Sequence, residues 1–357
     1  MNPIAYSRPA SIPEAIGAIG EPTDASSATR ACADAKFIAG GTNLTDLMKL
    51  HIMRPAQLVD INRLDLARIE ASEDGGIALG ALARNADTAY HPLVRTRYPL
   101  LSSAILAGAS PQIRNMATDG GNLMQRTRCY YFYDRATPCN KREPGSGCSA
   151  IGGLTRQHAI LGASAQCIAT HPSDMCVALA ALDATVHVHS KRGARCIAFG
   201  DFHRLPGDRA DLDNTLAQDE LITRITLPDA DRFAAHCVYL KLRDRLSYAF
   251  ALVSVAAALD VDEEGRIREA RLALGSVAHK PWRRPDAEKV LVGAPPDADS
   301  FGRAADVLLE GAKGQGANDF KIPLAHRAIV RALKVAYAGT VTNLRHHRSL
   351  PDPGAGE

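Results

Sequence analysis

The stretch "AKFIAGGTNLTDLMKL", residues 35–50, changes from an apolar run to a helical pattern at a pair of glycines. Its first four residues suit a buried strand, and after the glycines apolar residues recur at the spacing of a helix. A second short strand is expected in "AQLVDI", residues 56–61. The sequence therefore predicts a strand–turn–helix–strand unit near the N-terminus, with Gly40 and Gly41 in the turn.

This glycine turn has the features of a site for an anionic group. Glycines let the chain turn tightly and bring main-chain N–H groups close to a ligand. The following helix N-terminus adds unpaired donors and a positive dipole end. Thr42 and Asn43 offer side-chain hydrogen bonds. The pattern is neither G-x-G-x-x-G nor a Walker A loop, so an ordinary βα turn stays open as an alternative to a pyrophosphate site.

Two more loops carry the same polar and glycine-rich character. "ASPQIRNMATDGGNL", residues 109–123, again contains Gly-Gly followed by Asn, and "THPSD", residues 170–174, opens a helical segment. Three such loops, separated by strands and helices, predict several walls of one elongated cofactor pocket.

The bulk composition limits the function classes. The chain has 357 residues, 46% hydrophobic and 23% charged, which indicates two or three folded domains. A net charge of +3, with both signs mixed along the chain, argues against nucleic acid. The longest apolar stretch, residues 246–259, is short of the roughly 20 residues of a bilayer span, so no membrane insertion is expected. The N-terminus lacks the pattern of a secretion signal.

The order of the expected elements predicts an α+β protein. Strand and helix patterns alternate through residues 1–228, with a subdivision expected between 1–61 and 62–228. From about residue 233 to 343 longer strands precede three helical segments, which indicates a small C-terminal α+β domain, and 344–357 form a tail. The stretch "YAFALVSVAAALDVD" fits either a buried strand or a helix, because periodicity alone does not separate the two.

Four cysteines lie in the spacing C-x9-C-x8-C-x18-C, at Cys129, Cys139, Cys148 and Cys167. Structural zinc sites usually contain C-x2–4-C knuckles, and the familiar ferredoxin runs are also absent. The spacing alone leaves disulfides or free thiols, zinc and an iron–sulfur cluster open.

The residues around these thiols favour a negatively charged metal centre over disulfides. The cations Arg126, Arg128, Lys141 and Arg142 are close in sequence, and the amides of 145–148 are expected to be free to donate. The aromatic run "YYFY", residues 130–133, is expected to exclude water. A zinc ion with four thiolates would benefit from the same cations, so zinc stays open.

Together, "KFIAGGTNL", "QIRNMATDGGNL" and "HPSD" resemble the FAD-binding subunit of the molybdenum hydroxylases, the xanthine dehydrogenase and carbon monoxide dehydrogenase family. The resemblance covers residues 3–340 and implies a two-part FAD-binding domain of the vanillyl-alcohol-oxidase (PCMH) type, followed by a small α+β domain. The segments "DELI" and "YLKLRDR" match later positions of the family.

The resemblance also implies which residues contact FAD. Around the pyrophosphate it places Lys36, Ile38, Ala39, Gly40, Gly41, Thr42, Asn43 and Leu44. On a second wall it places Ala109, Ser110, Ala117, Thr118, Gly121, Asn122 and Met124. Ser173 and Asp174 would lie at the ribose or adenine, and Ile222 and Lys241 near the isoalloxazine.

Within the family, the chain is most similar to the aldehyde oxidoreductase type, which carries an iron–sulfur insertion after "GGNL". This similarity implies a [4Fe–4S] cluster on the four cysteines, in an insertion over residues 125–168. It implies an electron-transfer subunit of a heterotrimer with a molybdenum-cofactor large subunit and a [2Fe–2S] small subunit. Electrons would pass through FAD to an external acceptor.

Two other functions remain open at this point, as does the location. A stand-alone FAD oxidase would need its own catalytic base, and no catalytic residue is identified in the sequence. A zinc-stabilised assembly module would need neither flavin nor iron. The expected location is the periplasm, by co-export with a partner that bears the signal, or else the cytoplasm.

Overall fold

A computed structural model of the chain describes residues 3–20 and 35–340. The expected tail at 344–357 and the end of the predicted C-terminal domain at 341–343 lie outside the described residues. Among the described helices, none is long and apolar enough to cross a membrane.

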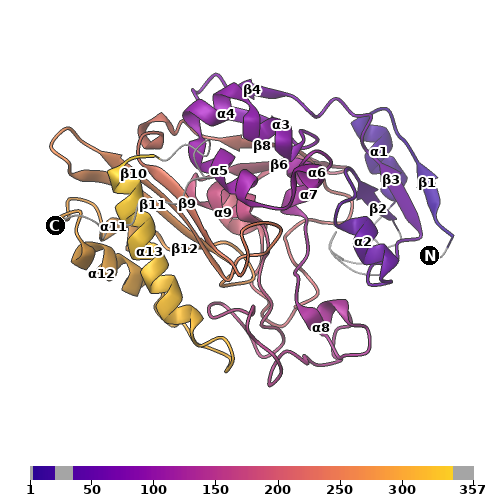
Figure 1. Ribbon diagram of the computed structural model, residues 1–357. Coiled ribbons are helices and arrows are strands. Elements are labelled where there is room, and N and C mark those ends of the chain that lie inside the picture. The colour runs from indigo at the N-terminus through magenta and orange to yellow at the C-terminus, as the bar shows by residue number, and fades with distance from the viewer. Residues whose placement is uncertain (1–2, 21–34, 341–357) are drawn as a thin grey trace.

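The N-terminal unit contains the predicted strand–turn–helix–strand. Strands β1 (Ala5–Ser7), β2 (Ala35–Ile38) and β3 (Gln57–Asp60) form a parallel sheet in the order β1-β3-β2. Helix α1 (Ile12–Ile19) packs its buried Ala and Ile residues against this sheet. Helix α2 (Leu44–Lys49) follows the glycine turn, at the right of Figure 1.

The central unit is a sheet of five strands in the order β4-β5-β8-β6-β7. Its strands are β4 (Ile69–Ala71), β5 (Ile77–Gly80), β6 (Thr185–Ser190), β7 (Gly193–Ala198) and β8 (Leu221–Leu227). Its helices are α3 (Asn85–Tyr90), α4 (Pro92–Arg97), α5 (Pro99–Ala107), α6 (Pro111–Arg114), α7 (Asp119–Leu123), α9 (Asp174–Ala181) and α10 (Phe199–Phe202).

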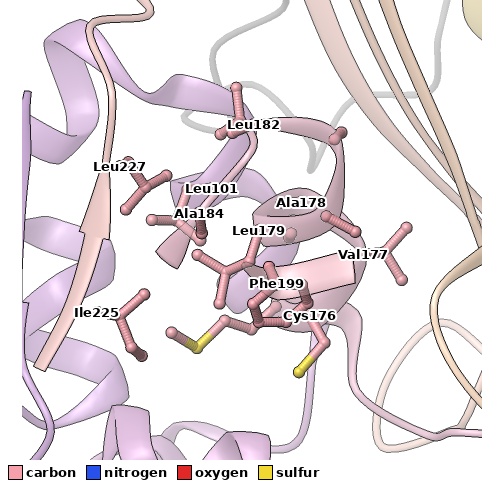
Figure 2. Packing of buried hydrophobic residues seen from close by; sticks show 14 of the residues in the cluster. Leu101, Cys176, Val177, Ala178, Leu179, Leu182, Ala184, Phe199, Ile225 and Leu227 are labelled. Atoms are coloured by element: carbon pink, nitrogen blue, oxygen red, sulfur yellow. The ribbon is translucent and has the colours of Figure 1, made fainter. Parts of the chain in front are cut away.

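Helix α9 is buried over its whole length and forms the centre of this unit. Its Leu179 packs among residues of the sheet and of α5, including Leu101 and Ile225, as Figure 2 shows. A helix that is apolar on all sides is expected in a core, and here the central unit and the C-terminal sheet enclose it. The position of α9 is therefore fixed, and its N-terminus at Ser173 is held in place.

The C-terminal unit is an antiparallel sheet covered by helices on one face. Its strands, in the order β12-β11-β10-β9, are β9 (Cys237–Leu242), β10 (Val253–Val261), β11 (Ile267–Gly275) and β12 (Trp282–Arg283). A 3-10 turn (Asp231–Phe233) precedes them, and the helices are α11 (Pro285–Lys289), α12 (Ala298–Leu308) and α13 (Lys321–Ala338). Helix α13 crosses the sheet at the left of Figure 1.

The segment that fits strand or helix equally well is strand β10. Its residues alternate between two cores: Ala256 and Ala258 join the core around α9, and Val255 and Ala257 join the core under α12 and α13. Because both faces of the strand are covered, its sequence is apolar throughout and shows no alternation.

The cysteine-containing insertion has little regular structure. Within residues 125–168 the helical segment is the single turn α8 (Tyr130–Tyr133). The insertion leaves the central unit after α7 and returns at α9, and Figure 1 shows it below both the central and the C-terminal units. The two ends of the insertion are therefore positioned by helices α7 and α9.

Candidate functional site

A cavity with a volume of about 740 Å³ lies where the three polar loops meet. Every residue predicted to contact FAD lines it except Ser110. The hydroxyl of Ser110 instead accepts a hydrogen bond from the main-chain N–H of Ile113 and caps α6. The loops that the sequence places far apart therefore form one elongated pocket.

The glycine turn and the second loop touch main chain to main chain. A Cβ atom built on Gly40 would lie 1.9 Å from the carbonyl oxygen of Met116, so only glycine fits at this position. Gly41 has a φ of +71°, which glycine adopts at low cost. The Arg84 guanidinium donates to the same Met116 carbonyl and fixes the second loop from the other side.

One donor in the glycine turn lacks a partner. The Asn43 side-chain oxygen accepts a hydrogen bond of 2.9 Å from the main-chain N–H of Arg126. Its side-chain NH₂ group is buried and has no acceptor. A buried donor without an acceptor costs on the order of 1–3 kcal/mol, so the position fits an oxygen-rich ligand.

A chain of buried polar side chains connects the second and third loops. The Ser173 hydroxyl donates to Asn122 at 2.6 Å, and the Asn122 amide donates to Asn85 at 2.8 Å. Asn85 and Thr88 in turn donate to the carboxylate of Asp119, at 2.7 and 2.6 Å. These bonds fix the orientation of Asn122 and Ser173, which both line the cavity.

Asp119 is fully buried at the end of this chain. Burial raises the pKa of its carboxyl to about 7, although the hydrogen bonds from Thr88 and Asn85 act in the opposite direction. The group is therefore close to half protonated at neutral pH.

A buried ion pair lies beneath the third loop. The Lys241 ammonium is 2.8 Å from one oxygen of Asp174, and the Tyr239 hydroxyl donates to the other at 2.6 Å. Lys241 also donates to the carbonyl of Ala107 at 3.0 Å. Both oxygens of Asp174 are thus engaged by the protein, and this pair joins β9 to the N-terminus of α9.

Part of the cavity wall, at Tyr248 and Phe250, has no signal in the sequence, whereas Asp244 and Arg245 belong to the segment "YLKLRDR". The loop after β9 contributes Asp244, Arg245, Tyr248 and Phe250. It contains no glycine or turn motif, and Tyr248 and Phe250 are exposed aromatics. Its place beside the cavity follows from the packing of the C-terminal sheet.

All four predicted cysteines line one small cavity in the insertion. Cys139 and Cys148 lie opposite each other in an isolated antiparallel bridge, and Cys129 precedes α8. Cys167, from the far end of the insertion, forms a small apolar cluster with Ala169 and Ala210, against which Cys129 packs. The four thiols, spread over 39 residues of sequence, therefore converge in space.

The spacing of the sulfur atoms bears on the alternatives. Each described cysteine is a free thiol. In the described residues, the one group of three metal-ligand atoms within 4.8 Å of one another is His171, Cys176 and His203, so the four cysteines are spread more widely. Four thiolates on one zinc ion would be about 3.8 Å apart, from a Zn–S distance of about 2.3 Å. The spacing of the four thiols therefore differs from that of four thiolates on one zinc ion.

The prediction that the amides of residues 145–148 are free to donate is wrong in detail, whereas Lys141, one of the predicted cations, lines the cysteine cavity. Amides of the 145–148 segment are already bonded: the side-chain oxygen of Asn140 accepts from Gly145 at 3.1 Å and from Gly147 at 2.8 Å. Ser146 N–H donates to the carbonyl of Glu143. The loop is thus held by its own hydrogen bonds, and its glycines provide the positive φ of its turns.

The four predicted cations are likewise occupied. Arg126 and Lys141 both pair with Asp213, and although burial opposes ionisation their charges hold the pKa of Asp213 below its ordinary value. Arg142 donates to main-chain carbonyls of the insertion. Arg128 donates to the Tyr133 hydroxyl at 2.7 Å. These cations stabilise the insertion through their hydrogen bonds and ion pairs. Because the Asp213 carboxylate offsets part of their charge, the net positive charge near the thiols is smaller than four cations would give.

Of the aromatic run, Tyr131 and Phe132 line the cysteine cavity, and Phe132 is fully buried. Tyr130 is exposed, and Tyr133 packs toward α2.

Burial raises the pKa of Cys129 to about 12 and that of Cys167 to about 11. Without a bound cation these thiols stay protonated.

The cysteine cavity and the large cavity share a wall. Arg128 lines the large cavity, and its neighbour Cys129 lines the cysteine cavity. Gln157 also lines the large cavity, and its neighbour His158 lies 3.1 Å from the Cys129 sulfur. Adjacent residues of the chain, Arg128 and Cys129, therefore line the two cavities, and His158 beside Gln157 contacts Cys129.

The buried group of His171, Cys176 and His203 has the donor types of a metal site but shows packing roles. His203 donates from Nε2 to the carbonyl of Leu123 at 2.9 Å, and the two imidazole rings are 4.3 Å apart between centroids. Burial lowers the pKa of His203 to about 4 and that of His171 well below its ordinary value. Both rings are therefore neutral.

Comparison with known proteins identifies the class of these features. Residues 2–230 match the family described as FAD binding domain in molybdopterin dehydrogenase, and residues 238–336 match the CO dehydrogenase flavoprotein C-terminal domain. The protein is thus a flavoprotein with the two domains of that class. The chain belongs to the FAD-binding subunits of the molybdenum hydroxylase family.

A curated relative and two solved structures are similar to the chain over most of its length. The aldehyde oxidoreductase FAD-binding subunit PaoB of Escherichia coli K12 is 49% identical over 323 residues, which are 90% of this chain and 97% of the relative. Carbon monoxide dehydrogenase from Hydrogenophaga pseudoflava matches with a TM-score of 0.70 at 24% identity, over 94% of this chain and 98% of that chain. Quinoline 2-oxidoreductase from Pseudomonas putida 86 matches with a TM-score of 0.68 at 25% identity, over 94% and 98%.

These comparisons confirm the resemblance and the α+β fold class that the sequence predicts, including binding of FAD. They also confirm that the chain is an FAD subunit of the multi-subunit aldehyde oxidoreductase and xanthine dehydrogenase type.

Proposed function

We propose that FAD lies along the 740 Å³ cavity, with its pyrophosphate at the glycine turn. The observation that carries this proposal is the convergence of the three loops, with a buried NH₂ donor of Asn43 that has no acceptor. The cavity volume is within the range of cofactor sites. When bound, FAD supplies the redox chemistry, and the protein positions it.

The residues of this chain would hold FAD in place and exclude water. Gly40 permits the close contact between two loops, and Asn122 and Ser173 are oriented by the buried polar chain. Lys241, paired with Asp174, is one of the buried charges at the cavity wall. No described side chain here is assigned the role of a catalytic base.

The four cysteines would hold a [4Fe–4S] cluster. Support comes from their convergence on one cavity, their wide spacing and the absence of disulfides among the described cysteines. In a cluster of this type each thiolate binds its own iron, so the sulfurs lie farther apart than on one zinc ion.

The function that these sites support is electron transfer within a heterotrimer. The large subunit with the molybdenum cofactor would oxidise an aldehyde, the small [2Fe–2S] subunit would relay electrons, and this chain would pass them through FAD to an external acceptor. The names of the relatives, as FAD-binding subunits and medium chains, support the multi-subunit arrangement.

The cluster assignment is tested by substituting one ligand. Cys139→Ser is expected to lower iron and acid-labile sulfide to near zero. FAD content should stay above half of the wild-type value, because Cys139 lines the cysteine cavity and not the 740 Å³ cavity. Cys196→Ser, at an exposed thiol on β7, is the control and should change neither. Zinc in place of iron in the wild type would select the assembly-module alternative, and retained iron in Cys139→Ser would contradict the ligand set.

A further inference from the structure

The imidazole of His158 makes the nearest polar side-chain contact to a cysteine of the cluster site. Its Nε2 atom lies 3.1 Å from the sulfur of Cys129. The ring is buried, with 2% of the residue exposed. No comparable side-chain contact is found at the other three thiols in the described residues.

The contacts of the His158 ring indicate which of its two nitrogens carries the proton. The Nδ1 atom of His158 is buried and has no hydrogen-bond partner. A neutral imidazole has one N–H donor and one acceptor nitrogen. A thiolate that binds a metal has no proton to donate, so a nitrogen 3.1 Å from it must be the donor, and His158 carries its proton on Nε2 when Cys129 is a cluster ligand.

The ring is held rigidly in this position. The main-chain carbonyl of His158 accepts hydrogen bonds from the Lys321 ammonium at 2.8 Å and from the Asn318 side-chain amide at 3.0 Å. The rings of Tyr130 and Tyr131 lie 6.3 and 6.2 Å from the imidazole, centroid to centroid. The start of α13 and the insertion together fix the donor at the thiol.

We propose that His158 is a positioning residue that donates a hydrogen bond from Nε2 to the Cys129 thiolate and thereby raises the reduction potential of the cluster. The inference rests on the proposed [4Fe–4S] cluster. A donor at a ligand sulfur withdraws electron density and stabilises the more negative reduced form. The bond also lies on the side of the cluster site that faces the FAD cavity, through the neighbouring residues Arg128 and Gln157.

The test uses the copurified complex and three forms of this chain. His158→Phe removes the donor while keeping a flat ring of similar size, and His158→Gln keeps an N–H donor. The midpoint potential of the cluster, from EPR-monitored redox titration, should become more negative in His158→Phe and return most of the way to the wild-type value in His158→Gln. The FAD midpoint and the iron content should not change.

The cluster and the role of His158 are overturned by different outcomes. A wild-type complex that lacks iron and sulfide overturns the proposed cluster, and the role of His158 with it. An iron-loaded His158→Phe with an unchanged cluster potential overturns the role of His158 alone. Should this variant lose its iron, pulsed EPR of the wild type with isotope-labelled histidine decides: a nitrogen coupling to the reduced cluster supports the bond, and its absence overturns it.

Discussion

At the scale of single residues, Gly40 shows how tightly the cofactor pocket is built. The sequence predicts a glycine turn there, but the reason for this glycine is the Met116 carbonyl of a loop more than seventy positions away. Sequence patterns describe neighbours along the chain, so the local turn is predictable and this contact is not.

Gly40→Ala is expected to weaken FAD binding and to lower the free energy of unfolding by about 1–3 kcal/mol, because the new methyl group meets main chain that has no room to move. FAD content and thermal unfolding measure both effects. Gly17→Ala in α1, where the added Cβ meets nothing within 4 Å, is the matched control and should stabilise by about 0.5–1 kcal/mol. Equal FAD content in Gly40→Ala and the wild type would contradict the role of the turn.

Asp119 gives a prediction about pH. Since burial raises its pKa from 3.8 to about 7, the folded state binds this proton more tightly than the unfolded state. The stabilisation is fully present below pH 3.8 and is lost as the pH rises to 7. In this window the free energy of unfolding falls by up to about 1.4 kcal/mol per pH unit at this group.

Asp119→Asn, which resembles the protonated acid, should remove this contribution. The stability of the wild type relative to the variant, from chemical denaturation at several pH values, is expected to decline between pH 4 and 7 and to level off above. A difference that is independent of pH, or that grows with pH, would show that Asp119 is ionised throughout.

At the scale of elements, the insertion is a loop structure held by side chains. Asn140 is central, because its side chain bonds two glycine amides and also donates to Gln166. The sequence predicts where the insertion begins and ends and which thiols it carries. It does not predict that its amides and cations are used internally, since those pairings depend on Asn140 and Asp213 at sites without a motif.

Asn140→Ala is expected to loosen the cysteine loop, because it removes the acceptor of the Gly145 and Gly147 amides, and each lost hydrogen bond contributes about 0.5–1.5 kcal/mol. Iron content should fall to less than half of the wild-type value while FAD is retained. Asn115→Ala, at an exposed position after α6, is the matched control and should leave both unchanged. Full iron loading of Asn140→Ala would show that the loop does not depend on this side chain.

Strand β10 illustrates the limit of periodicity at this scale. A strand covered on both faces has no polar face, and its sequence then fits a helix equally well. The structure decides because Ala256 and Val255 enter two different cores. Elements covered on one face, such as β6 with its alternating "TVHVHS", are predictable from sequence alone.

At the scale of the whole molecule, segments from both domains form one site. The 740 Å³ cavity that we propose for FAD draws on the N-terminal turn, the start of α9 and the loop after β9. The walls that carry motifs are recognisable in the sequence because they combine glycines with polar side chains, whereas the aromatic loop at Tyr248 and Phe250 carries no such motif. The assembly with partner subunits lies at this scale and gives the most direct test.

The central claim is that this chain receives electrons from partner subunits onto FAD. Under anaerobic conditions, an aldehyde added to the copurified complex should bleach the flavin absorption, and the same aldehyde added to the isolated FAD-loaded chain should not. Electron transfer through this subunit requires bleaching in the complex alone. Bleaching in the isolated chain would instead show a self-sufficient oxidase, and a complex that turns over aldehyde without reducing its flavin would contradict electron transfer through this subunit.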